Sequence, residues 1–436
     1  MSRKPERKDE MIRRLTKRIE KLLKEKIPDE PGTLEEIEKI TEEIGTNIKR
    51  DIQQGCVGQH GTGYVGVEIA CSCGGVARFK NYYDKRHVTL CAEMVIRRAY
   101  YYCEKCGSGF APVDKKLGLD SLCTSIGVRM RVARLAIWIP FERLSKELES
   151  LCYLHLSKNT LERITESVGE SVKKEKQQRE AQVFSGMADI PKLAPKRLYI
   201  GIDGTGVPMR GGGTRESKCG IIYETRESIG KTEVIRAEYL ATLERVESFG
   251  EAVYARAFDR GVERACDVAC LGDGATWIWR SFSQHYPKGV QILDYYHASE
   301  HLGVVAKAWF GEGTKKAKRW VKDRQRDLLS DCVETVIRSV RAWRPIDDES
   351  KEVRRLGLKY FTDNKDRMRY ASLGANGYHI GSGLVESTCK TVVGMRLKQS
   401  GMRWSESGAE SMLHLRSLLL TNPDVDLSRY ARTYLN

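Results

Sequence analysis

Three acidic residues stand in contexts suited to holding divalent cations. Asp203 and Asp273 each follow a run of apolar residues typical of a buried strand, and each precedes a glycine. Glu386 comes after a glycine-rich turn, at the start of a predicted helix. Carboxylates so placed can hold two Mg²⁺ or Mn²⁺ ions, which activate an attacking water or 3′-hydroxyl and stabilise a leaving oxygen. For Asp203 alone, the simpler interpretation is a strand-terminating residue in a turn.

The segment 197–209 contains the first of the predicted elements that position these acids. Residues 198–203 alternate between aliphatic and other side chains, the period of a strand. Glycines at 204 and 206 predict that the strand ends there, and Pro208 disfavours a following helix. The elements expected next are strands at 217–224 and 234–243, a helix at 247–260, a strand at 268–273, a helix at 275–286 and a strand at 290–294.

That order predicts a mixed α/β layer fold. In a ribonuclease H-like sheet the first and fourth strands of such a series are neighbours. Asp203 and Asp273 would then lie side by side at the strand tips. Residues 197–436 are therefore expected to form an RNase H-like domain, interrupted by a basic helical insertion at about 298–375. The insertion is either a solvated helical face or a surface that contacts a DNA backbone.

Composition bounds the partners of the protein. A chain of 436 residues is long enough for several domains, and a formal net charge of +15 favours a polyanion, most often nucleic acid. A solvated basic surface without a ligand is the alternative. The charged start of the chain resembles no secretory signal, and no stretch is apolar enough to span a bilayer. We therefore expect a cytoplasmic protein, associated with the nucleoid when bound to DNA.

The 13 cysteines are then core residues or metal ligands rather than disulfides. In the segment 56–113, Cys71 and Cys73 form a tight pair on a glycine turn, and Cys103 and Cys106 form a C-x-x-C knuckle. Two thiol pairs at the ends of a hairpin can place four sulfurs around a structural Zn²⁺. Weaker candidates in the same segment are Cys56 and His60 as spare ligands and Cys91 as a core residue.

The remaining segments are predicted to be helical. Residues 1–55 form an N-terminal helical region, which packs on its own chain or serves self-association. Thr33, with Glu36 three residues later, has the spacing of a capping box and predicts a helix start there. Residues 114–176 carry helical stripes of apolar residues that resemble a helix-turn-helix, although helical bundles that bind nothing share this pattern. In the DNA-binding alternative, the start of the last helix would face DNA with Lys158, Asn159 and Arg163. A polar stretch at 177–196 is expected to be a linker.

Near Glu386, the residues expected to add positive charge or to contact DNA are Lys390, Arg396, Lys398 and Arg403.

Taken together, the motifs resemble those of the ISKra4-type bacterial insertion-sequence transposases, which belong to the DDE, RNase H-like transposases. The resemblance covers most of the chain. Its most specific pieces are residues 202–209, 271–279, 294–297, 377–387 and 396–404.

Several residue roles follow from this resemblance. It implies that Asp203, Asp273 and Glu386 are the catalytic acids. It also implies that Asp294 and His297 form a D-x-x-H element, to which we assign, with Lys390, a supporting or DNA-positioning role. The knuckle at Cys103–Cys106 matches a zinc-ribbon-like segment of the family. The pair Cys71-Ser-Cys73 departs from the usual C-x-x-C, which leaves the zinc ligand set open.

The implied function is a DNA transposase that acts as a homodimer or higher homo-oligomer. It would bind the terminal inverted repeats of its element, hydrolyse a phosphodiester and direct the freed 3′-hydroxyl at target DNA. One alternative is a sequence-specific DNA-binding protein with a catalytically inactive nuclease-like core. Another is a cellular nuclease or resolvase, whose two-metal chemistry would be the same.

Overall fold

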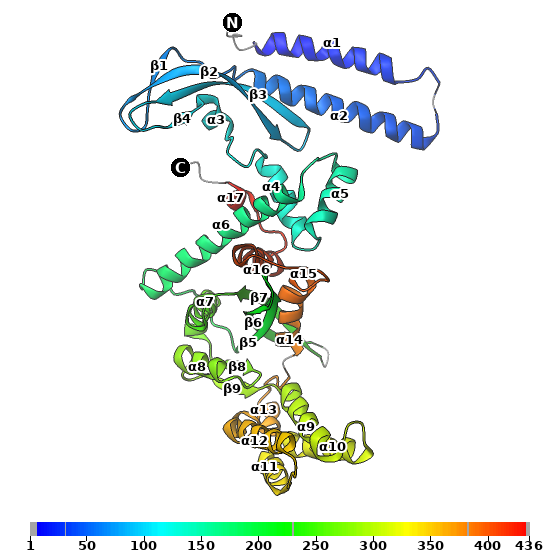
Figure 1. Cartoon of the computed structure of the whole chain (residues 1–436), viewed down its shortest axis with the longest axis vertical. Helices are drawn as coiled ribbons and strands as arrows, with labels where there is room; N and C mark the ends of the chain where they lie inside the picture. The colour runs from blue at the N-terminus through cyan, green and yellow to red at the C-terminus, as the bar shows by residue number, and fades with distance from the viewer. Residues whose placement is uncertain (1–6, 31, 229–230, 382, 433–436) are drawn as a thin grey trace. The chain divides into compact units, whose positions relative to one another are not determined.

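The structure, a computed structural model, has the mixed α/β composition that the sequence predicts (Figure 1). The residues that it describes are 7–30, 32–228, 231–381 and 383–432. They fall into two compact units, Met1–Val168 together with Asp426–Asn436, and Gly169–Val425. No helix among the described residues combines the length and the apolarity needed to cross a bilayer.

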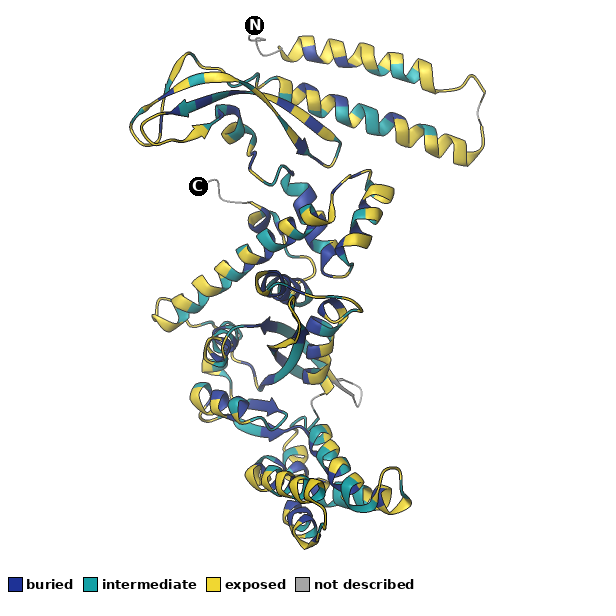
Figure 2. Cartoon of the chain, in the orientation of Figure 1, coloured by how far each residue is buried: buried dark blue, intermediate teal, exposed yellow. Residues whose placement is uncertain are grey.

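The first unit opens with two helices, α1 (Lys8–Lys26) and α2 (Leu34–Gly58). The side chain of Thr33 accepts a hydrogen bond from the amide of Glu36, whose carboxylate accepts one from the amide of Thr33. This reciprocal capping box starts α2 where the sequence predicts it. Only two side chains of α1 are buried, so most of this helix is exposed (Figure 2).

A four-stranded antiparallel sheet follows, in the order β1-β2-β3-β4. Its strands are β1 (Glu68–Ala70), β2 (Val76–Val88), β3 (Glu93–Cys103) and β4 (Gly109–Phe110). The long strands β2 and β3 form the expected hairpin, and their register brings Ala77 opposite Cys103. The short helix α3 (Pro112–Leu117) packs against β3 and supplies Asp114 as a partner for Arg98 at 2.5 Å.

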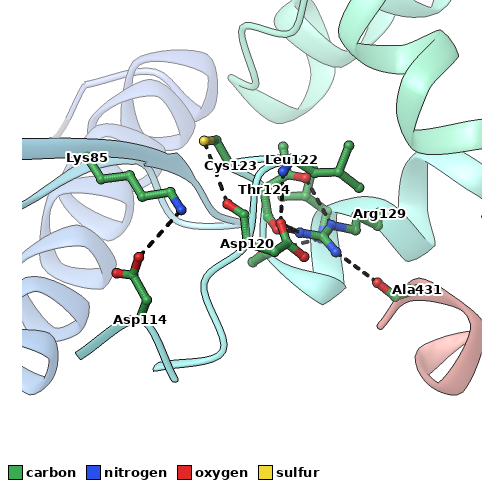
Figure 3. A network of polar contacts seen from close by, with 10 residues as sticks. Lys85, Asp114, Asp120, Leu122, Cys123, Thr124, Arg129 and Ala431 are labelled. Atoms are coloured by element: carbon green, nitrogen blue, oxygen red, sulfur yellow. Dashed lines mark hydrogen bonds and ion pairs between the residues drawn. The ribbon is translucent and has the colours of Figure 1, made fainter. Parts of the chain in front are cut away.

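Three helices and a short C-terminal helix complete this unit: α4 (Ile126–Ala136), α5 (Phe141–Cys152), the start of α6 (Lys158–Phe184) and α17 (Ser428–Ala431). Arg129 on α4 is fully buried and forms an ion pair with Asp120 at 2.5 Å. Its guanidinium also donates to the backbone oxygens of Thr124 and Ala431 (Figure 3). Arg129 therefore ties the C-terminal segment to α4.

The second unit contains a five-stranded sheet in the order β7-β6-β5-β8-β9. Its strands are β5 (Leu198–Pro208), β6 (Thr214–Ser228), β7 (Lys231–Thr242), β8 (Val268–Gly272) and β9 (Val290–Leu293). The first three pair antiparallel, whereas β8 runs parallel to both β5 and β9. The first and fourth strands of this unit are thus neighbours, as the sequence predicts.

Helices cover both faces of this sheet, which explains why β5 is buried on both sides. On one face Leu198, Ile200 and Ile202 share a core with α7 (Val246–Asp259) and α8 (Thr276–His285). On the opposite face, Tyr199 packs with Val385 of α14 (Gly383–Thr388). Beyond α14 the chain continues as a π-helical turn, η3 (Cys389–Gly394), then α15 (Met395–Leu397) and α16 (Glu406–Thr421), which packs against β7.

The predicted helical insertion consists of five helices and a short 3-10 turn between β9 and α14. They are α9 (Tyr295–Phe310), α10 (Lys315–Leu329), α11 (Val333–Ala342), α12 (Asp348–Asp363), η2 (Lys365–Arg367) and α13 (Tyr370–Ala375). Their apolar side chains, such as Leu302 and Phe361, belong to the same core as the α7–α8 face of the sheet. The insertion therefore packs against the sheet through a shared hydrophobic core.

The expected linker at 177–196 differs from the structure in its first part. Helix α6 continues to Phe184, so that residues 177–184 are helical. Arg179 in this stretch is held by Asp259 of α7 at 2.6 Å. A polar composition indicated a linker, but the polar side chains here form ion pairs with a neighbouring helix.

Candidate functional site

The two aspartates lie at the same height on neighbouring parallel strands. Pairing between β5 and β8 extends as far as Gly201 opposite Leu271. Asp203 and Asp273 each come two residues after that last pair. Because adjacent strands lie about 4.8 Å apart, this register sets the two residues side by side.

The carboxylate of Asp203 is half-buried and points toward the face covered by α14. Its Oδ1 accepts a hydrogen bond from the amide of Gly204 at 2.6 Å, and its Oδ2 lies 3.3 Å from the thiol of Cys389. Burial raises the pKa of Asp203, and the negative charge of Asp273 adds to this effect. The amide of Gly204, Cys389 and His297 lower the pKa in turn.

The prediction that the first strand ends at Gly204 is wrong. Strand β5 continues to Pro208, because β6 pairs with it along this whole stretch, from Gly204 opposite Lys218 to Pro208 opposite Thr214. The parallel partner β8 ends much earlier. Asp203 therefore lies where one edge of β5 becomes open while the other edge remains paired.

Asp273 is held by a turn directly after β8. Its Oδ1 accepts from the amide of Ala275 at 2.8 Å, and its backbone oxygen accepts from the hydroxyl of Tyr360 on α12 at 3.0 Å. The next residue, Gly274, has a φ of +112° and leaves no room for a side chain, since a Cβ would lie 2.6 Å from the Tyr360 ring. Glycine is thus required here for both backbone geometry and space.

Asp294 and His297 lie at the start of α9, close to the two aspartates. The buried carboxylate of Asp294 caps the helix by accepting from the amides of Tyr296 and His297. Its Oδ2 is 3.4 Å from Nδ1 of His297, an ion-pair distance without hydrogen-bond alignment. This carboxylate raises the pKa of His297 to about 9, with smaller contributions from Asp273 and Asp203. His297 is therefore a cation at neutral pH.

Helix α14 brings Glu386 near Asp203 through a close contact with β5. A Cβ at Gly201 would lie 2.3 Å from Cγ2 of Val385, so the glycine creates the notch in which Val385 sits. Glu386 is exposed and lies one turn before Cys389, whose thiol contacts Asp203. The sequence did not single out Cys389, although its helical spacing from Glu386 could have indicated it.

The three acids do not converge on one point. Among the described residues, only a cysteine cluster brings three or more potential ligand atoms within 4.8 Å of one another. Asp203 and Asp273 form a pair, and Glu386 lies on a separate element, α14. No described Lys or Arg forms an ion pair with any of the three. Carboxylate oxygens that have no Lys or Arg ion pair are suitable ligands for a hard cation such as Mg²⁺.

One network of polar contacts, which we call the clamp, joins the residues just before β5 and β8 to the loop before α14. Arg197, just before β5, contacts Asp267, just before β8, at 2.6 Å. Its guanidinium also donates to the backbone oxygen of Gly377 at 2.6 Å and stacks on the ring of Tyr378 at 3.8 Å. The hydroxyl of Tyr378 donates to Asp267 at 2.7 Å. The clamp thus joins β5, β8 and the loop that leads into α14, a role that the sequence did not reveal.

The predicted basic residues near Glu386 divide into two groups. Lys390, Lys398 and Arg403 are exposed, and the amine of Lys398 lies 2.5 Å from the hydroxyl of Thr205. Arg396, in contrast, is fully buried, with its guanidinium 5.0 Å from the Trp404 ring. The prediction that Arg396 contacts DNA is therefore wrong, because this side chain is packed inside the unit.

In the first unit, the residues predicted to face DNA lie on the first turns of α6. Lys158, Asn159 and Arg163 are all exposed. The apolar side of the same turns, including Leu161 and Ile164, is fully buried. The structure thus leaves this polar face accessible, as a DNA-binding helix requires.

The four predicted zinc ligands come together in the small sheet. The sulfurs of Cys71 and Cys106 are 3.7 Å apart, as are those of Cys73 and Cys103. Four sulfurs about 2.3 Å from a tetrahedral Zn²⁺ would be about 3.8 Å apart, whereas a disulfide needs about 2.05 Å. This four-cysteine cluster could therefore bind zinc. Cys56 and His60 are not part of it.

A lowered pKa at one thiol of the cluster favours metal binding, because thiolates rather than thiols are the metal ligands. Hydrogen bonds from Ser108 lower the pKa of Cys106 to about 6. The amide of Gly75 lowers the pKa of Cys73, but the neighbouring thiols, Cys106 first, raise it to about 11. Cys106 is thus the thiol favoured to ionise first, and a metal would displace the protons of the others.

The fold and the site define a mixed α/β protein with two aspartates where the parallel pairing of β5 and β8 ends, and with a four-cysteine cluster. Residues 77–430 match the uncharacterised protein family UPF0236, and the chain belongs to this family. One relative is the "UPF0236 protein in vanSb 3'region" of Streptococcus gallolyticus. It is 25% identical over 351 residues, which cover 76% of this chain and 72% of the relative.

Proposed function

We propose that this protein is a DNA transposase that cleaves and joins strands with Asp203, Asp273 and Glu386. The observation that carries the proposal is the pair of aspartates, each two residues beyond the last pair of the parallel strands β5 and β8 and without a described Lys or Arg ion pair, in a chain of net charge +15. Acids that served only stability in such a chain would be expected to pair with some of its many cations. Acids that are kept for a metal would not.

The strand order supports an RNase H-like assignment for the second unit. Three antiparallel strands are followed by two that run parallel to the first, and the first and fourth are adjacent. The resemblance of the acid-bearing motifs to ISKra4-type transposases agrees with this order. The four-cysteine cluster, built at two turns of an antiparallel sheet, likewise supports a zinc-ribbon-like assignment for the first unit.

In this proposal the protein residues hold and orient the reacting groups. When bound, two Mg²⁺ or Mn²⁺ ions would activate the attacking water or 3′-hydroxyl and stabilise the leaving oxygen. Asp203 and Asp273 would supply ligands from the rigid sheet. Glu386 would supply one ligand from α14. Its side chain is exposed, which leaves space for a phosphodiester. His297, held cationic by Asp294, would stand beside the site and attract the phosphate.

The partners in this proposal are the terminal inverted repeats of a mobile element and its target DNA, bound by a homodimer or higher homo-oligomer. The exposed face of α6 with Lys158, Asn159 and Arg163 would contribute to end recognition.

The test is strand cleavage and joining on duplexes taken from the DNA that flanks this reading frame. With Mg²⁺ or Mn²⁺, the wild-type protein should release a 3′-hydroxyl at an element end and join it to a second duplex. Asp203→Asn, Asp273→Asn and Glu386→Gln should each lower the rate at least about 10³-fold, because each removes a metal ligand. Sequence-specific binding that survives EDTA with no cleavage would favour the non-catalytic DNA-binding alternative. Cleavage without preference for element ends would favour a nuclease.

A further inference from the structure

Helix α10 carries a continuous basic stripe on its exposed side. Its members recur at i, i+3, i+4, i+7 and i+11, which places them on one face of the helix. They are Lys315, Lys318, Arg319, Lys322 and Arg326, and all five are exposed. The opposite side, with Ala317 and Leu328, is buried in the insertion.

The stripe is unfavourable for the helix itself. Lys315 and Arg319 are like charges one turn apart, as are Lys318 and Lys322, and such pairs destabilise an isolated helix. The first turn contains no acidic residue, so its cations also stand at the positive end of the helix dipole. The local preferences of a helix therefore do not explain this arrangement.

Helix α12, in the same insertion, carries exposed cations that each have a carboxylate partner. On α12, Lys351 pairs with Asp348, Arg355 with Glu352, and Lys359 with Asp363, each within one helical turn. On α10, Arg324 pairs with Asp327 in the same way, but among the described residues of the stripe only Arg326 has such a partner, Asp323. No described carboxylate forms an ion pair with Lys315, Lys318, Arg319 or Lys322. Four cations are thus left available for an external anion.

Space for such an anion lies next to the stripe. A hollow of about 580 Å³ between α9 and α10 is bordered by Lys318 and Lys322. Its border also includes Gly303 and Gly313, and a Cβ at either glycine would meet nothing within 4 Å. The hollow is also lined by Lys307, Gln325 and Glu312, and Lys307 pairs with Glu312 at 3.0 Å.

We propose that the α10 stripe binds the phosphodiester backbone of duplex DNA. A row of cations separated by about one helical turn matches a regularly charged polyanion better than a small ion. The inference rests on the proposed function only in naming DNA as that polyanion, since the charge pattern stands by itself.

The position of α10 gives this contact a place relative to the acids. Helix α9 starts beside Asp294 and extends for 16 residues, or about 24 Å. A loop of four residues then returns the chain, so that α10 packs along α9 (Figure 1). The stripe therefore lies within about 24 Å of the acid site along the helix axis, less than the roughly 34 Å of one turn of B-DNA. It would hold duplex DNA within one helical turn of the phosphate at the aspartates.

The test compares two triple variants with the same change of charge. One is Lys315→Gln, Lys318→Gln and Lys322→Gln on α10. The matched control is Lys351→Gln, Arg355→Gln and Lys359→Gln on α12. Binding of a 30-base-pair duplex of arbitrary sequence is measured by fluorescence anisotropy in EDTA over a range of salt concentrations. Because this assay requires no metal or cleavage, it can fail or succeed independently of the proposed catalysis.

We expect the α10 variant to bind DNA at least about tenfold more weakly at 0.1 M salt, and the control to change much less. The salt dependence of log K should lose about 2–3 units of slope, close to 0.9 for each lost phosphate contact. The melting temperature of the α10 variant should not fall, because it removes like-charge pairs. Equal losses of duplex binding in the two variants, or no loss in the α10 variant, would overturn the proposal.

Discussion

At the scale of single residues, two buried charged groups decide local stability. Arg129 is enclosed by Asp120, Thr124 and the backbone of Ala431, so its charge is fully compensated. Removing one partner of a buried pair leaves the other charged and unpaired, which costs about 3–5 kcal/mol.

We therefore expect Arg129→Met to lower the free energy of unfolding by about 3–5 kcal/mol, measured by urea unfolding. Arg131, exposed on the same helix, is the matched control, and Arg131→Met should change stability by less than about 0.5 kcal/mol. Similar effects of the two substitutions would contradict a structural role for the Arg129 network.

Glu410 on α16 gives a prediction for the pH dependence of stability. Burial alone would raise the pKa of Glu410, but hydrogen bonds from His414, Thr242 and the amide of Leu243 lower it to about 2. A group with a depressed folded-state pKa contributes stability above its unfolded pKa of about 4.5, and this is lost as the pH falls toward 2. The contribution is on the order of 3 kcal/mol.

Urea unfolding of the wild type and of Glu410→Gln should show this contribution. The stability advantage of the wild type should be largest at pH 6 and should shrink as the pH is lowered to 3, since the unfolded carboxylate then takes up a proton. A difference between the two proteins that is independent of pH would show that the carboxylate charge is not what holds α16 on β7.

At the scale of elements, we expect the small β1–β4 sheet to depend on its four thiols for stability. The cluster of buried side chains beside them is small, and a structural zinc would supply folding energy that it lacks. We expect about one zinc per chain by elemental analysis. Cys103→Ser should lose the metal and make the segment 65–113 sensitive to protease. Cys91→Ser, in the same segment but outside the cluster, should keep both metal and resistance. Full zinc content in Cys103→Ser would exclude the four-cysteine site.

The clamp is the element that fixes the loop before α14. Arg197→Gln removes its contacts with Asp267 and Gly377, so hydrogen exchange in residues 376–390 should become faster. The control is Arg179→Gln, which breaks an Arg–Asp pair of similar exposure in the same unit and should leave this segment unchanged. Equal protection in both variants would show that the clamp does not position Glu386.

At the scale of the whole molecule, sequence patterns predicted the elements better than their contacts. The alternation in residues 198–203 and the capping box at Thr33 are local signals, and both predictions are confirmed. The extension of β5 past Gly204 was missed because it depends on pairing with β6, far along the chain. The burial of Arg396 was missed because a cation stacked on Trp404 has the same local pattern as a solvated one.

The candidate site shows the same division. The strand order and the apolar runs predicted that Asp203 and Asp273 would be neighbours, and the register of β5 and β8 sets them side by side. The packing position of α14 on β5 could not be predicted, because it depends on how Val385 packs into the space at Gly201. That packing determines how close Glu386 comes to the two aspartates.

Whether these acids hold divalent ions together can be seen by anomalous diffraction from crystals grown with Mn²⁺ and duplex DNA. Manganese peaks are expected about 2.2 Å from the carboxylate oxygens of Asp203 and Asp273, with Glu386 as a further ligand, and they should be lost in Asp203→Asn. Well-ordered aspartates without a manganese peak between them, or peaks unchanged in Asp203→Asn, would contradict this expectation.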